Sequence, residues 1–180
     1  MTGVQTCALP IFGETWVDHW GKHKQEATRG VIEPSAKGDP LLRGVEDVFG
    51  DSDVYEAHPT ADVKILLRGQ SLAGMKPTDP PADYKRKNQG INDPMMPVAW
   101  TRLNQNESGK ANRILCTTMG AATDLESEGL RRLVVNGVYW GLGLEIPAKA
   151  SVDLVGEYQP TKYGFEIFKK GVKPAEHELK

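Results

Sequence analysis

Histidine and carboxylate side chains gather in a short stretch near the start of the chain. Residues 14–23 contain Asp18, His19 and His23, with Glu14 nearby. Imidazole and carboxylate groups are ligands that suit zinc or a similar divalent ion. His19 and His23 also have the i, i+4 spacing of a ligand pair on a helix, so we expect them to hold a metal ion if the chain has one. The alternative is a polar surface loop, because Gly21 interrupts any helix here.

A second polar stretch follows at residues 53–58 and contains Asp53, Glu56 and His58. Histidines and carboxylates are the usual proton carriers in enzymes. If the protein is an enzyme, we expect His19 and His58, together with Asp53 or Glu56, to be its catalytic residues, facing the loop at Gly120. The alternative is that each is an ordinary hydrogen-bonded residue, and only their convergence in one pocket distinguishes the two interpretations.

Aromatic residues accompany both stretches, and aromatic faces beside polar groups are common in carbohydrate sites. We expect Trp16 and Tyr55 to contact a ligand, together with Gly120, which lies where a strand would end before a helix. For Trp16 and Trp20 the alternative is a place in the core, since tryptophan is usually largely buried. For Gly120 the alternative is that it only permits a turn.

Three short apolar runs predict the buried strands that position these residues: residues 63–67 (VKILL), 97–101 (PVAWT) and 113–118 (RILCTT). Residues 103–111 predict a turn between the last two strands. An amphipathic helix follows, beginning at residues 123–127 and ending near Gly143, with an apolar surface wide enough to pack on a sheet. The proline-rich residues 70–97 are long for a connection and predict a lid or a solvated segment.

Composition indicates one globular domain. The net charge of −2 and the 39% apolar content give no sign of nucleic-acid binding, and no apolar stretch is long enough to cross a membrane. Residues 1–11 look like a translated sequencing adapter, so we expect a non-biological leader there and a natural amino terminus that is missing, which leaves localisation undetermined. Cys116 lies within an apolar run, and we expect it to be buried and unreactive.

Four segments carry a family resemblance: residues 39–45 (DPLLRGV), 97–100 (PVAW), 117–120 (TTMG) and 131–143 (RRLVVNGVYWGLG). In this order they resemble ThuA-like (trehalose utilisation) domains. The resemblance implies a fold similar to class I glutamine amidotransferases, a three-layer α/β/α sheet of flavodoxin-like kind, of which the N-terminal strands would be missing. Residues 12–148 would be the C-terminal part of such a domain, and residues 149–180 a surface tail.

The same resemblance implies a role in carbohydrate utilisation, with trehalose or a related disaccharide as the small-molecule partner and a divalent metal as the cofactor to test. Two departures argue against carrying over an activity. The loop after residue 116 lacks the His-x-Glu pair of an amidotransferase, and Ala121 stands where ThuA relatives often have histidine. A non-catalytic module that binds a sugar or a partner is therefore the alternative function.

Overall fold

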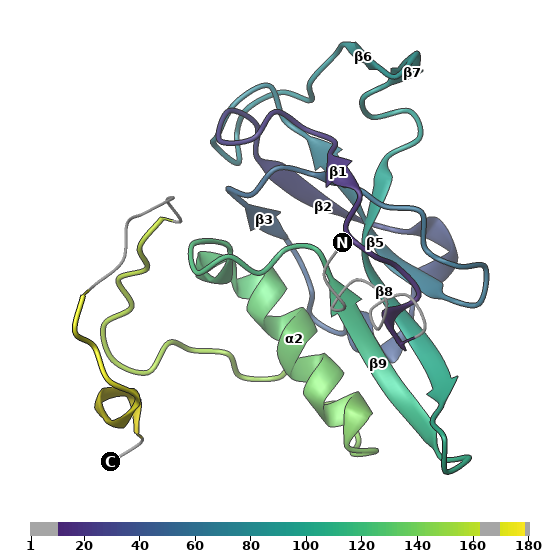
Figure 1. Cartoon of the computed structure of the whole chain (residues 1–180), viewed down its shortest axis with the longest axis vertical. Coiled ribbons are helices and arrows are strands. Elements are labelled where there is room, and N and C mark those ends of the chain that lie inside the picture. The colour runs from purple at the N-terminus through teal and green to yellow at the C-terminus, as the bar shows by residue number, and fades with distance from the viewer. Residues whose placement is uncertain (1–10, 163–169, 179–180) are drawn as a thin grey trace.

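The computed structural model describes residues 11–162 and 170–178 of the chain. Within them the protein consists mostly of β-strands, with one α-helix, α2 (Glu128–Gly141), packed beside them (Figure 1). The strands are β1 (Asp18–His19), β2 (Thr28–Ile32), β3 (Phe49–Gly50), β4 (Tyr55–Glu56), β5 (Lys64–Ser71), β6 (Lys85–Arg86), β7 (Gln89–Gly90), β8 (Met96–Gln105) and β9 (Ala111–Thr117). Short 3₁₀ helices lie at Pro34–Ala36, Pro40–Leu42, Asp124–Glu126 and Pro174–His177.

The central sheet has five strands in the order β3-β2-β5-β8-β9, and all neighbouring strands are antiparallel. The expected three-layer α/β/α, flavodoxin-like fold is therefore wrong. Parallel neighbours need a crossover of about a dozen residues or more, usually a helix, on a face of the sheet. Here β8 and β9 are joined directly by a turn, and in the described part of the chain only α2 is available to cover the sheet.

The positions of the strands were predicted correctly, because the three apolar runs lie within or overlap β5, β8 and β9. The expected burial is confirmed for β5 and β8 but not for β9, whose residues are exposed or partly buried. The turn between β8 and β9 is also confirmed. Its Asn106 side chain accepts hydrogen bonds from the backbone N–H groups of Ser108 and Lys110. An apolar run indicates a buried strand but says nothing about the direction of the neighbouring strand, and that is where the prediction failed.

The expected helix is present and packs against β9, as predicted. It begins at the end of the expected range of residues 123–127: Ser127 is the N-cap, and its hydroxyl accepts a hydrogen bond from the backbone N–H of Leu130. Leu130 and Leu133 are fully buried on the inner face. Gly137 allows close approach to the sheet, because a Cβ there would lie 2.1 Å from the side chain of Leu115.

Residues 72–95, which lie within the segment expected to be a lid or solvated, are tied to the domain at several points. Ile91 is buried, and its carbonyl oxygen accepts a hydrogen bond of 2.8 Å from the indole N–H of buried Trp20. Asn92 bridges to the backbone of Ser71 and Ala82. A long connection can thus be ordered by a few buried side chains and backbone hydrogen bonds that periodicity does not reveal.

Only parts of the two chain ends lie within the described residues. The expected leader falls almost wholly outside the described residues; Ile11, its last residue, is exposed and belongs to none of the named strands. The first residues of the expected surface tail pack on α2, where the carbonyl oxygens of Ala150 and Val152 accept hydrogen bonds from Arg132 and Arg131.

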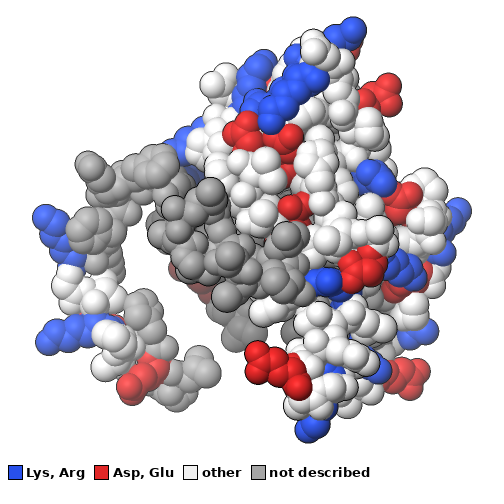
Figure 2. Space-filling model, turned by 45° about the vertical axis from the view of Figure 1, so that its right-hand side comes forward, with Lys and Arg blue, Asp and Glu red and all other residues white. Residues whose placement is uncertain are grey.

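Surface properties of the described residues agree with the composition. None of the helices they form has the length and apolar character needed to cross a membrane. On the face shown in Figure 2, acidic and basic side chains are interspersed.

Candidate functional site

A pocket of about 1160 Å³ opens between the N-terminal polar stretch and the loop that follows β9. Its walls come from four parts of the chain that are distant in sequence. They are residues 16–24, residues 51–55, residue 75 and residues 117–123, with Thr161 and Lys162 completing the rim. The pocket therefore exists only because the fold brings these segments together.

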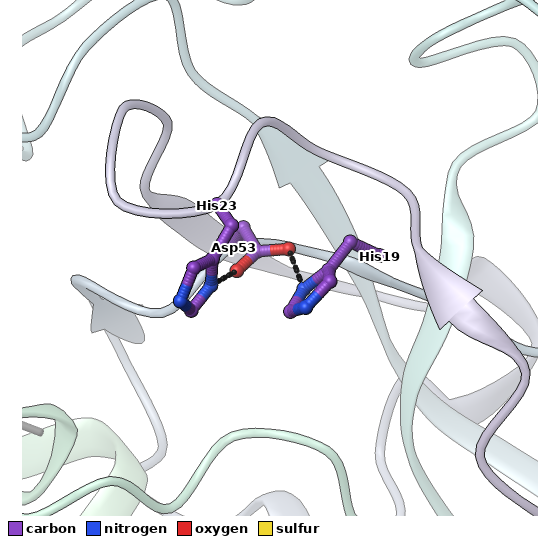
Figure 3. A group of neighbouring side chains, drawn as sticks. All are labelled: His19, His23 and Asp53. Carbon is purple, nitrogen blue, oxygen red and sulfur yellow. Dashed lines mark hydrogen bonds and ion pairs between the residues drawn. The ribbon is translucent and has the colours of Figure 1, made fainter. Parts of the chain in front are cut away.

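His19, His23 and Asp53 form the centre of this pocket (Figure 3). The Nδ1 atom of His19 lies 2.8 Å from Oδ2 of Asp53, and the Nδ1 atom of His23 lies 2.9 Å from Oδ1. The two imidazole centroids are 4.5 Å apart. One carboxylate thus holds two imidazoles side by side, one at each oxygen.

Burial differs sharply within this cluster. The Asp53 side chain is only 2% exposed, whereas those of His19 and His23 are 34% and 39% exposed. Because a carboxylate can only accept, each neutral ring donates through Nδ1–H, and its Nε2 keeps a free lone pair. The cluster therefore has a buried orienting carboxylate and two accessible imidazoles.

Strand pairing explains which predicted residues reach the pocket. β1 and β4 are antiparallel, with His19 opposite Tyr55 and Asp18 opposite Glu56. Since successive side chains of a strand point to opposite faces, His19 and Tyr55 share the pocket face and Asp18 and Glu56 share the other. His19 and Tyr55 line the pocket, and Asp18 binds Arg86 instead.

His58 and Glu56 are not brought to the pocket. Nε2 of His58 lies 3.3 Å from Glu56, and the His58 side chain is 64% exposed. Lys87 donates a hydrogen bond of 2.5 Å to Glu56 and holds the pKa of this carboxyl below its usual range, although partial burial acts in the opposite direction. Of the four residues proposed for catalysis from the sequence, only His19 and Asp53 converge.

The two tryptophans of the first stretch have different roles. Trp20 belongs to the core, as the alternative for it predicted, whereas Trp16 is 53% exposed at the pocket. Trp16 and Tyr55 both meet the His19 ring edge-on, with centroid distances of 5.9 Å and 5.5 Å. Burial, with the nearby charges of Asp53 and Asp124, raises the pKa of Tyr55, so its hydroxyl remains protonated and able to donate.

The loop at Gly120 forms another part of the pocket wall. The backbone N–H groups of Gly120 and Ala121 donate to the carboxylate of Asp124. Gly120 therefore lines the pocket without a free backbone donor of its own. The sequence interpretation did not include Asp124, whose only local signal is an Asp at the start of a 3₁₀ helix three residues after Ala121.

Cys116 lies in β9 beside this loop and is partly buried. Burial, with a smaller effect of the negative charge of Glu14, raises the pKa of its thiol to about 11. The thiolate, which is the reactive form, is therefore scarce at neutral pH.

The donor set of the cluster fits a divalent transition metal. One atom from each of His19, His23 and Asp53 can be chosen so that all lie within 4.8 Å of one another. Two imidazoles and one carboxylate are the ligand set of several catalytic zinc sites, which keep further coordination positions for water or substrate.

Comparisons with protein-family models, with curated proteins and with solved structures found no match to this chain. What the pocket does must therefore be argued from its own geometry.

Proposed function

We propose that this protein binds a carbohydrate in the pocket at His19, His23 and Asp53, and that these residues hold a divalent metal ion to which the sugar is bound. The observation that carries the proposal is the convergence of two partly exposed imidazoles on one buried carboxylate inside an open pocket. Burying a carboxylate is costly unless its oxygens are satisfied, so this arrangement constrains both rings strongly.

His19 and His23 would hold the ion, and Asp53 would complete the set or orient both rings through Nδ1. A zinc-like ion supplies a Lewis acid that makes a coordinated hydroxyl or water more acidic at neutral pH. The chain contributes the orientation of the rings and a partly enclosed pocket. Tyr55, with its raised pKa, contributes a neutral hydroxyl beside His19.

A carbohydrate is the proposed ligand because the pocket combines an exposed aromatic ring with many hydroxyl and carboxylate groups. Trp16 presents a ring at the pocket, on which the C–H face of a sugar can pack. Asp51, Thr118 and Thr123 line the same pocket and offer hydrogen-bonding groups for sugar hydroxyls. Trehalose, the disaccharide expected from the sequence, and related disaccharides are the probes.

The metal is tested by titrating Zn²⁺ into the chelator-treated chain by isothermal titration calorimetry. We expect one site, and a loss of affinity on the order of 100-fold or more in His23→Ala, because a ligand is removed. His58→Ala is the matched control, since His58 is exposed and outside the pocket. Equal Zn²⁺ affinity in the wild type and His23→Ala would contradict the proposed metal site.

The carbohydrate is tested by titrating trehalose with and without Zn²⁺. We expect binding that needs Zn²⁺ and is weakened in Trp16→Ala, while the melting temperature of this variant stays close to that of the wild type because Trp16 is exposed. Incubation with trehalose, followed by product analysis, then separates an enzyme from a binding module. Failure of trehalose and related disaccharides to bind the zinc-loaded chain would overturn the carbohydrate assignment.

A further inference from the structure

We infer that Asp124, which does not line the pocket, is a positioning residue. It holds two segments of the pocket wall, residues 51–53 and residues 117–123, in a fixed arrangement relative to each other. The expected effect of Asp124 on Zn²⁺ affinity rests on the proposed function. The structural role of Asp124 is independent of that function, because it concerns how the two segments are held before anything binds.

Asp124 is fully buried and accepts four hydrogen bonds. The backbone N–H and the hydroxyl of Ser52 donate to it, at 3.1 and 2.8 Å. The backbone N–H groups of Gly120 and Ala121 donate to Oδ2, the oxygen that also accepts from the Ser52 hydroxyl, at 2.9 and 3.1 Å. A carboxylate with several backbone donors is stable without a cation, so the charge is compensated locally.

The two sets of donors belong to two different segments of the chain that both line the pocket. Ser52 immediately precedes Asp53, the residue that orients both imidazoles, and the other two donors belong to the loop that follows β9. The amide and hydroxyl of Ser52 are held by Asp124, and its carbonyl oxygen accepts a hydrogen bond of 2.7 Å from the hydroxyl of Thr28, so the residue that immediately precedes Asp53 is fixed on both sides. Asp124 thereby links the position of the histidine cluster to the position of the loop.

Gly50 packs closely against the Asp124 carboxylate. A Cβ on Gly50 would lie 2.5 Å from Oδ1 of Asp124, closer than any side chain could be accommodated without a shift. Thr123, next to Asp124, donates a hydrogen bond to Asp51, which makes a second link between the same two segments. The Asp124 carboxylate is therefore enclosed by its hydrogen-bond donors and by Gly50, where a side chain would collide with it.

Asp124→Asn is the informative substitution because it keeps the size of the side chain and changes one acceptor into a donor. Oδ2 faces three donors and Oδ1 faces the Ser52 N–H. Whichever way the amide turns, its NH₂ group meets at least one donor, and the two segments are pushed apart. Ser52→Ala is the milder second variant, since it removes a single hydrogen bond and adds no repulsion.

The experiment records the imidazole ¹⁵N signals of His19 and His23 by NMR in the metal-free full chain, at a temperature at which each variant is folded. In the wild type we expect both rings to be protonated at Nδ1. In Asp124→Asn we expect a mixture of tautomers, and in Ser52→Ala a smaller change in the same direction. Asp62→Asn is the control, because Asp62 is an exposed carboxylate that binds Arg102 outside the pocket.

A Zn²⁺ titration of the same variants gives the second measurement. We expect Asp124→Asn to lose affinity by about 10-fold to 100-fold, as for other residues that act through a ligand. If Asp124→Asn lowers the melting temperature but leaves the imidazole signals unchanged, Asp124 is merely structural and the inference is overturned. If the signals change while no chain binds Zn²⁺, the inference stands and the proposed metal site fails. Should Asp124→Asn not fold, unchanged signals in Ser52→Ala overturn the inference.

Discussion

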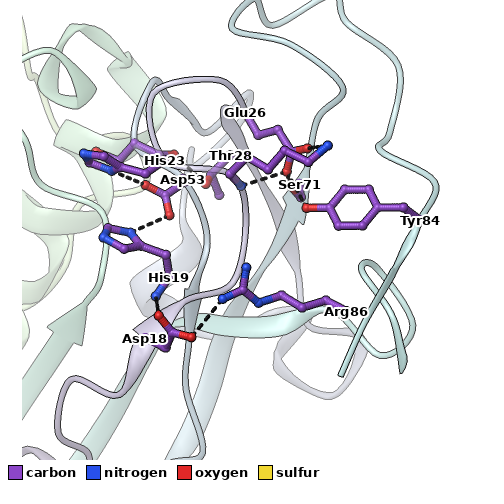
Figure 4. A network of polar contacts seen from close by, with 11 residues as sticks. Asp18, His19, His23, Glu26, Thr28, Asp53, Ser71, Tyr84 and Arg86 are labelled. Carbon is purple, nitrogen blue, oxygen red and sulfur yellow. Dashed lines mark hydrogen bonds and ion pairs between the residues drawn. The ribbon is translucent and has the colours of Figure 1, made fainter. Parts of the chain in front are cut away.

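Two buried carboxylates lie close together in this protein and differ in what their partners do (Figure 4). Asp53 accepts from His19 and His23, whereas Glu26 accepts from the hydroxyls of Ser71 and Tyr84 and from the backbone N–H of Lys22. Both residues are 4% exposed. The Lys22 ammonium lies 3.3 Å from the other oxygen of Glu26. Glu26 thus has no imidazole partner, whereas each donor of Asp53 carries a second ring nitrogen in an open pocket.

The comparison shows that burial of a carboxylate does not identify a functional site. A buried acid must be hydrogen-bonded wherever it lies, because an unpaired one would be destabilising. Asp53 and Glu26 differ in whether their hydrogen-bond donors carry another atom that can bind a ligand. The substitutions below test that distinction, from the largest expected effect to the smallest.

Asp53→Asn should give the largest change. The amide can accept from only one imidazole, so one ring loses its orienting partner, and we expect Zn²⁺ affinity to fall by on the order of 100-fold. Calorimetric titration of the chelator-treated chain measures this. Glu26→Gln is the matched control and should bind Zn²⁺ as the wild type does. A similar loss of affinity in both variants would abolish the contrast between the two carboxylates.

Glu26→Gln should instead reduce stability. All three donors meet one oxygen of Glu26, Oε2, and the Lys22 ammonium lies 3.3 Å from the other, Oε1. The amide of glutamine can offer its oxygen to the three donors, but they then bond a neutral acceptor, and its NH₂ group faces the Lys22 ammonium. We expect the free energy of unfolding to fall by about 1–3 kcal/mol, because hydrogen bonds to a charged acceptor are stronger than those to a neutral one. Urea denaturation followed by tryptophan fluorescence measures it. A variant as stable as the wild type would show that the Glu26 network is not structural.

The pH dependence of stability should distinguish the wild type from Glu26→Gln. Burial alone would raise the pKa of Glu26, but the hydrogen bonds from the Lys22 backbone, Tyr84 and Ser71 outweigh it and hold the pKa below its ordinary value of 4.5. The stability that this charge contributes is therefore full above pH 4.5 and is lost as the pH falls through the lower pKa of the folded state.

We accordingly expect the gap in unfolding free energy between the wild type and Glu26→Gln to be constant near neutral pH and to narrow on acidification. Urea denaturation at a series of pH values measures the gap. A gap that widens below pH 4.5 would have the wrong sign for a carboxyl with a lowered pKa.

The smallest effects are expected from substitutions of two tyrosines, Tyr84 and Tyr55. Tyr84 donates to Glu26, while Tyr55 lies beside His19 in the pocket. Tyr84→Phe should lower the free energy of unfolding by about 1 kcal/mol and leave trehalose affinity unchanged, because one internal hydrogen bond is lost. Tyr55→Phe should weaken trehalose binding and leave stability nearly unchanged. If the two variants exchanged these effects, the division between a structural network and a binding site would be reversed.

Local features of this chain were predictable from the sequence. Three strands, the turn between β8 and β9, and the amphipathic helix were identified because the spacing of apolar residues and the turn residues are properties of neighbouring positions. Trp16, Tyr55, His19, His23 and Asp53 were also identified as candidates by residue type alone, and all of them line the pocket.

Only the tertiary structure decided how these parts are combined. Strand direction depends on which segments pair and how they are connected, so the antiparallel order of the sheet was not predicted, and the α/β/α fold was wrong. The alternation of side chains in β4, paired with β1, placed Tyr55 in the pocket and Glu56 outside it. Asp53 reaches His19 and Asp124 reaches Ser52 across long separations in the chain, and such contacts have no local signature because they arise from the packing of whole segments.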